Sequence, residues 1–156
     1  MKSIYDYTAK DIYTLFSDLY KEKYGISYKG AGFIGNEMHL IKVAIEENGS
    51  ANVACATLNC IKTNSKTVNV PFFMAGLKYY LTSYNPSIFW AVERYGDKRI
   101  RRLWKQYLFL DSTWLPKASH RLKIKEIYKE LKEWADAKTT STPQKRKVNT
   151  KKPNEY

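Results

Sequence analysis

The sequence predicts an all-α protein, a compact bundle of about six or seven helices followed by a disordered basic C-terminal tail. Three observations predict this fold class. Apolar residues recur at the i, i+3, i+4 spacing of helices, N-capping residues precede these segments, and glycine or proline separates them. No alternation of strands and helices is found. We therefore expect one helical domain over residues 1–138 and a tail over 139–156.

The first predicted helix has the clearest local signals. Thr8 is suited to cap a helix that begins at Ala9, and Gly25 is suited to end it. Between them the apolar residues form a single stripe: Ile12, Leu15, Phe16, Leu19 and Tyr20. This helix is therefore expected to bury one face.

Two further helices are predicted before residue 64. Asn36 is suited to cap a helix ending at Gly49, with Met38, Ile41 and Ile45 facing inward. Ser50 opens the next, which runs to about Thr63. Residues 64–70 are expected to form a loop, with a short extended piece over 67–70.

The helix predicted from Phe72 to about Ser83 follows Pro71, a residue suited to the first turn. It is apolar nearly all round, so we expect it to be the buried central helix. Asn85 and Pro86 then restart the chain, and a short helix ends at Gly96.

Two helices remain in the basic part of the chain. Asp97 caps the first, whose inward residues are Ile100, Leu103, Trp104 and Tyr107. A turn over residues 111–116 leads to Ser119, the expected cap of a long helix to about Lys138. Its inward residues are Ile124, Ile127, Leu131 and Trp134. The tail after residue 138 lacks apolar periodicity and is expected to be disordered.

The net charge of +12 is concentrated in two segments. Residues 1–97 hold ten Lys or Arg and nine Asp or Glu, whereas residues 98–125 hold nine against one. Residues 126–138 are close to neutral, and the tail holds five against one. A concentrated basic patch is typical of proteins that bind a polyanion, although a solvated surface that aids solubility is the alternative.

The basic residues next to the apolar stripe of the Asp97 helix have a helical spacing of their own. One face can pack while the adjoining face contacts phosphates. The predicted nucleic-acid contacts are Lys98, Arg99, Arg101, Arg102, Lys105, Lys117, Arg121, Lys123 and Lys125, supplemented by Lys145, Arg146 and Lys147 in the tail. Trp114, in the turn between the basic helices, is a candidate for stacking on a base or for burial in the core.

The segment Gly30-Ala-Gly-Phe-Ile-Gly35 matches the G-x-G-x-x-G pattern of dinucleotide sites. That motif requires a buried strand just before it, and residues 24–29 instead form a polar turn after a helix. We interpret the segment as a helix connector. In a weaker functional form of the motif, its amides and Lys29 would receive a phosphate oxygen of a nucleic-acid backbone.

Other reactive residue types form no catalytic set. Cys55 and Cys60 are spaced too awkwardly for a disulfide or a paired metal site and are expected to be buried apolar residues. His39 is expected at the core or its boundary, and His120 as a possible phosphate contact. Glu46 and Glu47 are expected to be solvated. We therefore expect no enzymatic activity, no metal and no cofactor.

No apolar run approaches the roughly 18–20 residues of a membrane span, and the N-terminus lacks the apolar stretch of a secretion signal. The sequence thus predicts a cytoplasmic protein without a membrane partner. Its oligomeric state is not indicated by any of these patterns.

Two stretches carry a family resemblance. They are Phe16-Ser-Asp-Leu-Tyr-Lys-Glu-Lys-Tyr-Gly25 with Tyr28, and Asn36-Glu-Met-His-Leu-Ile-Lys-Val-Ala-Ile-Glu-Glu-Asn-Gly49. They resemble helical segments of small phage and bacterial DNA-replication accessory proteins, including the C-terminal domains of DnaD-type replisome organisers. The resemblance covers about a quarter of the chain, which has no obvious winged-helix half. It implies a small DNA-handling protein of a phage-infected or bacterial cell.

The sequence-based hypothesis is a nucleic-acid-binding protein, with DNA the expected partner, in an accessory role in replication or transcription. RNA is a related alternative that composition does not separate from DNA. The chief rival is a protein-interaction factor whose basic face docks on an acidic surface of a polymerase, helicase or other host protein.

Overall fold

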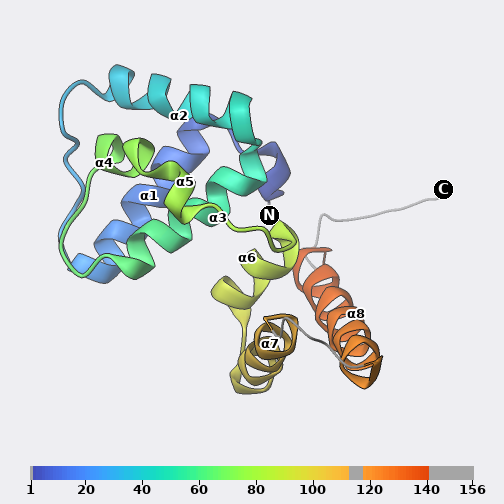
Figure 1. Ribbon diagram of the computed structural model, residues 1–156. Helices are drawn as coiled ribbons and strands as arrows, with labels where there is room; N and C mark the ends of the chain where they lie inside the picture. Colours follow the sequence, from blue (N-terminus) through green and yellow to red (C-terminus); the bar gives the residue numbers. More distant parts are fainter. Residues whose placement is uncertain (1, 113–117, 141–156) are drawn as a thin grey trace. The chain divides into compact units, whose positions relative to one another are not determined.

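The computed structural model describes residues 2–112 and 118–140, and every regular element in these ranges is a helix (Figure 1). Eight α-helices and one short 3-10 helix are found there, which confirms the all-α prediction. The chain divides into two compact units, one from Lys2 to Pro86 and one that begins at Ser87. A single domain over residues 1–138 stays a prediction.

The first unit begins with a 3-10 turn, η1 (Ile4–Asp6), and helix α1 (Ala9–Tyr24). The predicted boundaries of α1 are confirmed, because Thr8 accepts a hydrogen bond from the amide of Asp11 and Gly25 adopts a left-handed conformation with φ 76°. Asp11 reciprocates by accepting from the amide of Thr8, at 2.9 Å. All five residues of the predicted apolar stripe are buried.

Helix α2 (Ile34–Asn48) begins two residues before the predicted cap. Its N-cap is Phe33, which makes no side-chain capping bond, so Asn36 is a helical residue and the predicted cap is wrong. The predicted end at Gly49 is confirmed, and there the backbone turns into α3 (Ser50–Thr63).

The buried central helix of this unit is α3, and not the aromatic segment after Pro71. Nine of the 14 residues of α3 are buried, and α3 packs against α1, α2, α5 and η1. Its inward residues are mostly small, so neighbouring helices can approach closely on several sides. Of the large aromatic residues that suggested a central helix at 72–83, Phe73 is buried, but Phe72 is 49% and Tyr79 77% exposed.

The segment after Pro71 is also not one helix. It forms α4 (Val70–Ala75) and the single turn α5 (Leu77–Tyr80), interrupted at Gly76. Glycine costs about 1 kcal/mol relative to alanine in a helix interior, which favours a break there. Asn69 caps α4 by accepting from the amide of Phe72, and residues 67–69 form no strand. Asn69 has an extended backbone, but Val70 already begins α4, so the predicted extended piece at 67–70 does not reach residue 70.

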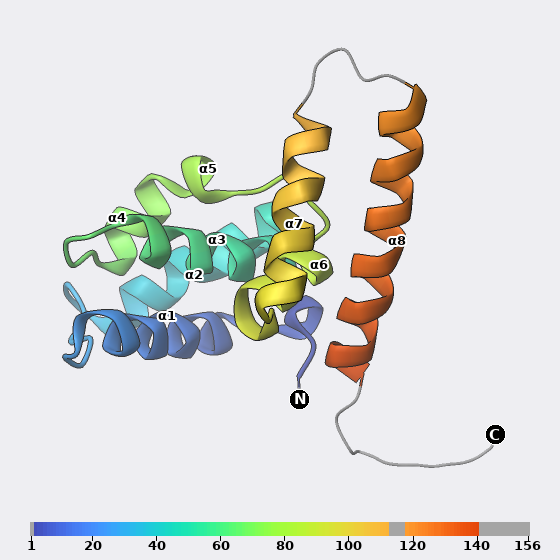
Figure 2. The same ribbon diagram turned by 90° about the horizontal axis from the view of Figure 1, so that it is seen from below.

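The second unit contains α6 (Pro86–Tyr95), α7 (Lys98–Asp111) and α8 (Ala118–Thr140). Helices α7 and α8 pack against each other and run antiparallel (Figure 2). Helix α8 begins at Ala118, so Ser119 is helical and is not the predicted cap, and it ends two residues beyond the predicted Lys138. Ile127, Leu131 and Ala135 form its buried stripe. The predicted disordered tail lies outside the described residues from position 141 onward.

Candidate nucleic-acid interface

Helix α7 starts at a sharply defined corner after α6. Asp97 caps it, its carboxylate accepting from the amide of Ile100 at 2.9 Å, as the sequence predicts. Gly96 closes the corner, because a Cβ atom there would lie 2.5 Å from the carbonyl oxygen of Val92. Only glycine fits at that distance, so the direction in which α7 leaves α6 is fixed by this residue.

The apolar face of α7 is held by aromatic packing. Ile100 is fully buried and Trp104 is 8% exposed. The ring of Trp104 meets Phe89 of α6 edge-on, with centroids 6.4 Å apart, and stacks on Tyr107 at 5.5 Å. Tyr107 in turn contacts Tyr128 of α8. These contacts fix the rotation of α7 about its axis and therefore which side chains it exposes.

Four predicted contact residues lie together on the exposed side of α7. They line a shallow cavity of about 330 Å³, which we call the α7 basic hollow: Lys98, Arg101, Arg102 and Lys105. All four side chains are exposed to solvent. No carboxylate lines the hollow among the described residues, so its local charge is wholly positive.

Arg101 differs from the other three because backbone carbonyls already bind it. Its Nε donates to the carbonyl of Gly96 at 3.0 Å, and one Nη donates to that of Glu93 at 3.2 Å. These carbonyls belong to the last turn of α6 and the corner after it, where helical acceptors lack intrahelical partners. Arg101 therefore joins the end of α6 to α7 while keeping its charge beside the hollow.

Arg99 lies outside the hollow and is paired with an acid. Its Nη1 is 2.6 Å from Oε2 of Glu130 on α8, and both side chains are more than half exposed. An exposed pair of this kind adds at most about 1 kcal/mol to stability. Its main effect here is on charge, because Glu130 offsets the Arg99 guanidinium and leaves it less available to a phosphate.

The remaining three cations of the hollow make no hydrogen bond or ion pair within the described part of the chain: Lys98, Arg102 and Lys105. They follow one another at i, i+4 and i+7, so they form one stripe along the helix. With a rise of about 1.5 Å per residue, their backbone positions are about 6 and 4.5 Å apart along the axis. An extended polyanion could meet all three.

On α8 the predicted contacts divide between two sides. Arg121, Lys123 and Lys125 are all exposed. At about 100° per residue, Arg121 and Lys125 flank the buried stripe on one side and Lys123 flanks it on the other. The structure thus does not bring all three into one surface. Lys117, Trp114 and the tail residues Lys145, Arg146 and Lys147 lie outside the described residues.

The glycine-rich connector is hydrogen-bonded to a buried carboxylate of helix α2. Glu37, only 2% exposed, accepts a hydrogen bond from the amide of Ala31 at 2.6 Å and another from the Tyr28 hydroxyl at 2.9 Å. The Ala31 amide that was considered for a phosphate oxygen is therefore occupied by a carboxylate of α2. The phosphate-receiving role of this amide is a prediction that the structure contradicts.

Sequence reasoning missed Glu37 as a structural residue. Its one local signal is its place in the first turns of a helix after a glycine-rich segment, where a carboxylate is stabilised by the helix dipole. Its burial depends on Tyr28, whose hydroxyl also accepts from the amide of Val70 at 2.9 Å. These bonds connect the 25–33 connector, α2 and α4.

The histidine and cysteine predictions have mixed outcomes. His39 is exposed, so its predicted place at the core or its boundary is wrong. His120 is partly buried, and its Nδ1 atom is enclosed without a hydrogen-bond partner. Cys55 and Cys60 are buried, as predicted, and are not joined in a disulfide, and burial raises the pKa of Cys60 to about 11. Glu46 and Glu47 are exposed, as predicted.

The described residues contain no cluster of three or more His, Cys, Asp or Glu side chains placed to hold a metal ion. None of their helices combines the length and apolar character needed to cross a bilayer.

Comparison of the chain with protein-family models, curated proteins and solved structures finds no match.

Proposed function

We propose that the chain binds nucleic acid, with DNA the expected partner, and that the α7 basic hollow receives the phosphate backbone. The observation that carries this proposal is the stripe formed by Lys98, Arg102 and Lys105. These three exposed cations share one side of a helix and have no internal partner within the described ranges. A stripe of uncompensated charge attracts a polyanion because each neutralised phosphate releases condensed counterions.

Arg99 differs from the cations of the α7 basic hollow because it has an acidic partner. Where α7 faces α8, an acid offsets the cation at 2.6 Å, and in the hollow no acid does so. Apolar packing on the opposite face holds the helix in place, so the cations are presented on a rigid element. Contacts to the phosphate backbone position a protein on nucleic acid without reading the base sequence, so we expect little sequence preference. An accessory role in phage or bacterial replication or transcription accords with such binding.

The test is fluorescence anisotropy with labelled single-stranded DNA, duplex DNA and RNA at several salt concentrations. The test variant combines Lys98→Gln, Arg102→Gln and Lys105→Gln. The matched control combines Lys10→Gln, Lys21→Gln and Lys42→Gln, which removes the same charge from exposed positions of the other unit. The hollow variant should reduce the slope of log affinity against log salt by about three, and the control by much less.

Equal losses in the two variants would mean that only net charge matters, and the hollow would then have no special role. Absence of binding to all three probes at low salt would retire the proposal. In that case the alternative partner is an acidic protein surface, which a pull-down after nuclease treatment would recover with the natural chain and lose with the hollow variant.

A further inference from the structure

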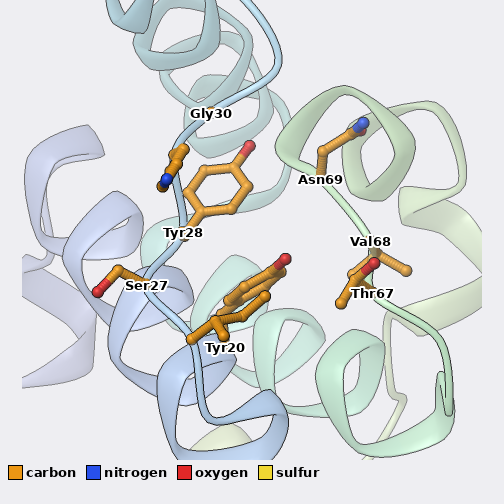
Figure 3. Close-up of a pocket in the computed structure, with 9 residues that line it drawn as sticks. Tyr20, Ser27, Tyr28, Gly30, Thr67, Val68 and Asn69 are labelled. Atoms are coloured by element: carbon orange, nitrogen blue, oxygen red, sulfur yellow. The ribbon is translucent and has the colours of Figure 1, made fainter.

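A second, larger cavity lies in the Lys2–Pro86 unit and plays no part in the proposed function. It has a volume of about 660 Å³, within the range of small-molecule sites. It opens between the connector that precedes α2 and the loop that precedes α4, with Tyr20 of α1 at its base. Figure 3 shows Tyr20 and Tyr28 on one side of the cavity and Thr67 and Val68 on the other.

The Tyr20 hydroxyl is the unusual feature of this cavity. Tyr20 is only 8% exposed, and its ring packs against Tyr24, Tyr28 and Phe16. Its hydroxyl nevertheless makes no hydrogen bond within the described part of the chain, and Figure 3 shows it directed toward the cavity. The hydroxyl oxygen is accessible from the cavity, so water or a polar group of a ligand can form a hydrogen bond with it there.

The neighbouring Tyr28 cannot serve in the same way. Its hydroxyl already donates to Glu37 and accepts from the amide of Val70. The buried carboxylate of Glu37 is also occupied, because each of its two oxygens already accepts a hydrogen bond. The polar side-chain groups of the lining that remain for a ligand are the hydroxyls of Tyr20, Ser27 and Thr67, the Nδ2 of Asn69 and the amino group of Lys29.

The charge of the lining restricts the class of ligand. Lys29 is its single ionic residue among the described residues, and no ion pair engages it there. The ligand should therefore carry an anionic group. The tyrosine rings and Val68 offer an apolar wall, which favours a flat ring system as the body of the ligand. Inorganic phosphate alone would leave this wall uncovered.

We propose that this cavity binds a nucleoside monophosphate, with the base against the tyrosine-lined wall, an acceptor bonded to the Tyr20 hydroxyl, and the phosphate near Lys29. The site is separate from the α7 basic hollow and does not require that the hollow bind nucleic acid.

The test is isothermal titration calorimetry with adenosine monophosphate. It is performed in the Lys98→Gln, Arg102→Gln, Lys105→Gln background, so that phosphate binding at the hollow does not contribute to the signal. Failure of either proposal is then distinguishable from failure of the other. Three single variants are compared in this background: Tyr20→Phe, Lys29→Gln, and the control Lys42→Gln, an exposed lysine of α2 outside the cavity.

We expect one bound nucleotide per chain. Loss of the Tyr20 hydroxyl should weaken binding by about threefold to tenfold. Loss of the Lys29 charge should weaken it by about tenfold, and Lys42→Gln should leave it unchanged. Adenosine without its phosphate should bind as weakly to the background protein as the monophosphate does to the Lys29→Gln variant.

The absence of measurable binding at about 1 mM adenosine monophosphate would overturn the proposal. So would equal affinity of the background protein and its Lys29→Gln variant, or of adenosine and its monophosphate. Tyr20→Phe retains the packed ring, and circular dichroism checks its fold. The exposed Lys29 substitution keeps the test decisive if the Tyr20 variant does not fold.

Discussion

Tyr28 donates a hydrogen bond to the buried carboxylate of Glu37, with 2.9 Å between the hydroxyl oxygen and Oε1. The other oxygen of Glu37 accepts from the amide of Ala31, and the Tyr28 hydroxyl accepts from the amide of Val70. The connector, helix α2 and the first residue of helix α4 are therefore joined through one carboxylate and one hydroxyl.

Replacing Glu37 by alanine should lower the free energy of unfolding by about 2–4 kcal/mol. The substitution leaves the Ala31 amide and the Tyr28 hydroxyl without their acceptor in a buried region. Urea denaturation measures the change. The control is Glu46→Ala on the same helix, where the side chain is exposed and the expected change is within about 0.5 kcal/mol. Similar losses in both variants would contradict a structural role for Glu37.

Tyr28 should make stability sensitive to alkali. Burial, reinforced by the adjacent Glu37 carboxylate, raises the pKa of Tyr28 well above its usual value near 10. Folding therefore favours the protonated hydroxyl. The contribution of this pKa shift to the free energy of unfolding is complete below a pH of about 10. It is lost as the pH rises further toward the folded-state pKa. Urea midpoints measured from about pH 8 to 11 should fall less steeply for Tyr28→Phe than for the natural chain.

Tyr28 accounts for only a part of the alkaline loss of stability. Burial also raises the pKa of Tyr13 and Tyr24, so the Tyr28→Phe variant should retain part of the alkaline loss. An unchanged pH dependence in the variant would show that the Tyr28 hydroxyl does not titrate differently in the folded chain.

Arg101 and Arg102 are adjacent in sequence but should respond differently to alanine. Arg101→Ala removes two bonds to backbone carbonyls, so unfolding free energy should fall by about 0.5–1.5 kcal/mol. Arg102→Ala should leave stability nearly unchanged and reduce the salt slope of nucleic-acid binding by about one. Thermal unfolding and salt-dependent anisotropy on both variants make the comparison. A loss of stability in Arg102→Ala but not in Arg101→Ala would contradict the bonds that Arg101 makes between α6 and α7.

Gly96→Ala should be destabilising by about 1–3 kcal/mol, because its Cβ would lie 2.5 Å from the carbonyl oxygen of Val92. Gly35→Ala is the matched control. A Cβ at Gly35 meets nothing within 4 Å, and the residue lies in helix α2, so alanine should stabilise by up to about 1 kcal/mol. Denaturant titration of the two variants should therefore show shifts of opposite sign.

The sequence by itself determined the features that depend on neighbouring residues. Thr8 and Asp97 cap their helices through bonds that reach three positions along the chain, and Gly25, Gly49 and Gly96 end helices where expected. The cationic stripe of α7 also follows from its period alone. Caps and faces of this kind are decided within one or two helical turns, so local pattern suffices.

The tertiary structure decided what distant residues do to one another. It made α3 the central helix, because small residues can be enclosed on several sides whereas α4 and α5 each leave an aromatic residue, Phe72 and Tyr79, exposed. It paired Arg99 with Glu130, 31 positions away, and buried Glu37 beneath Tyr28. Such pairings depend on distances in space that helix packing sets, and no local period encodes them.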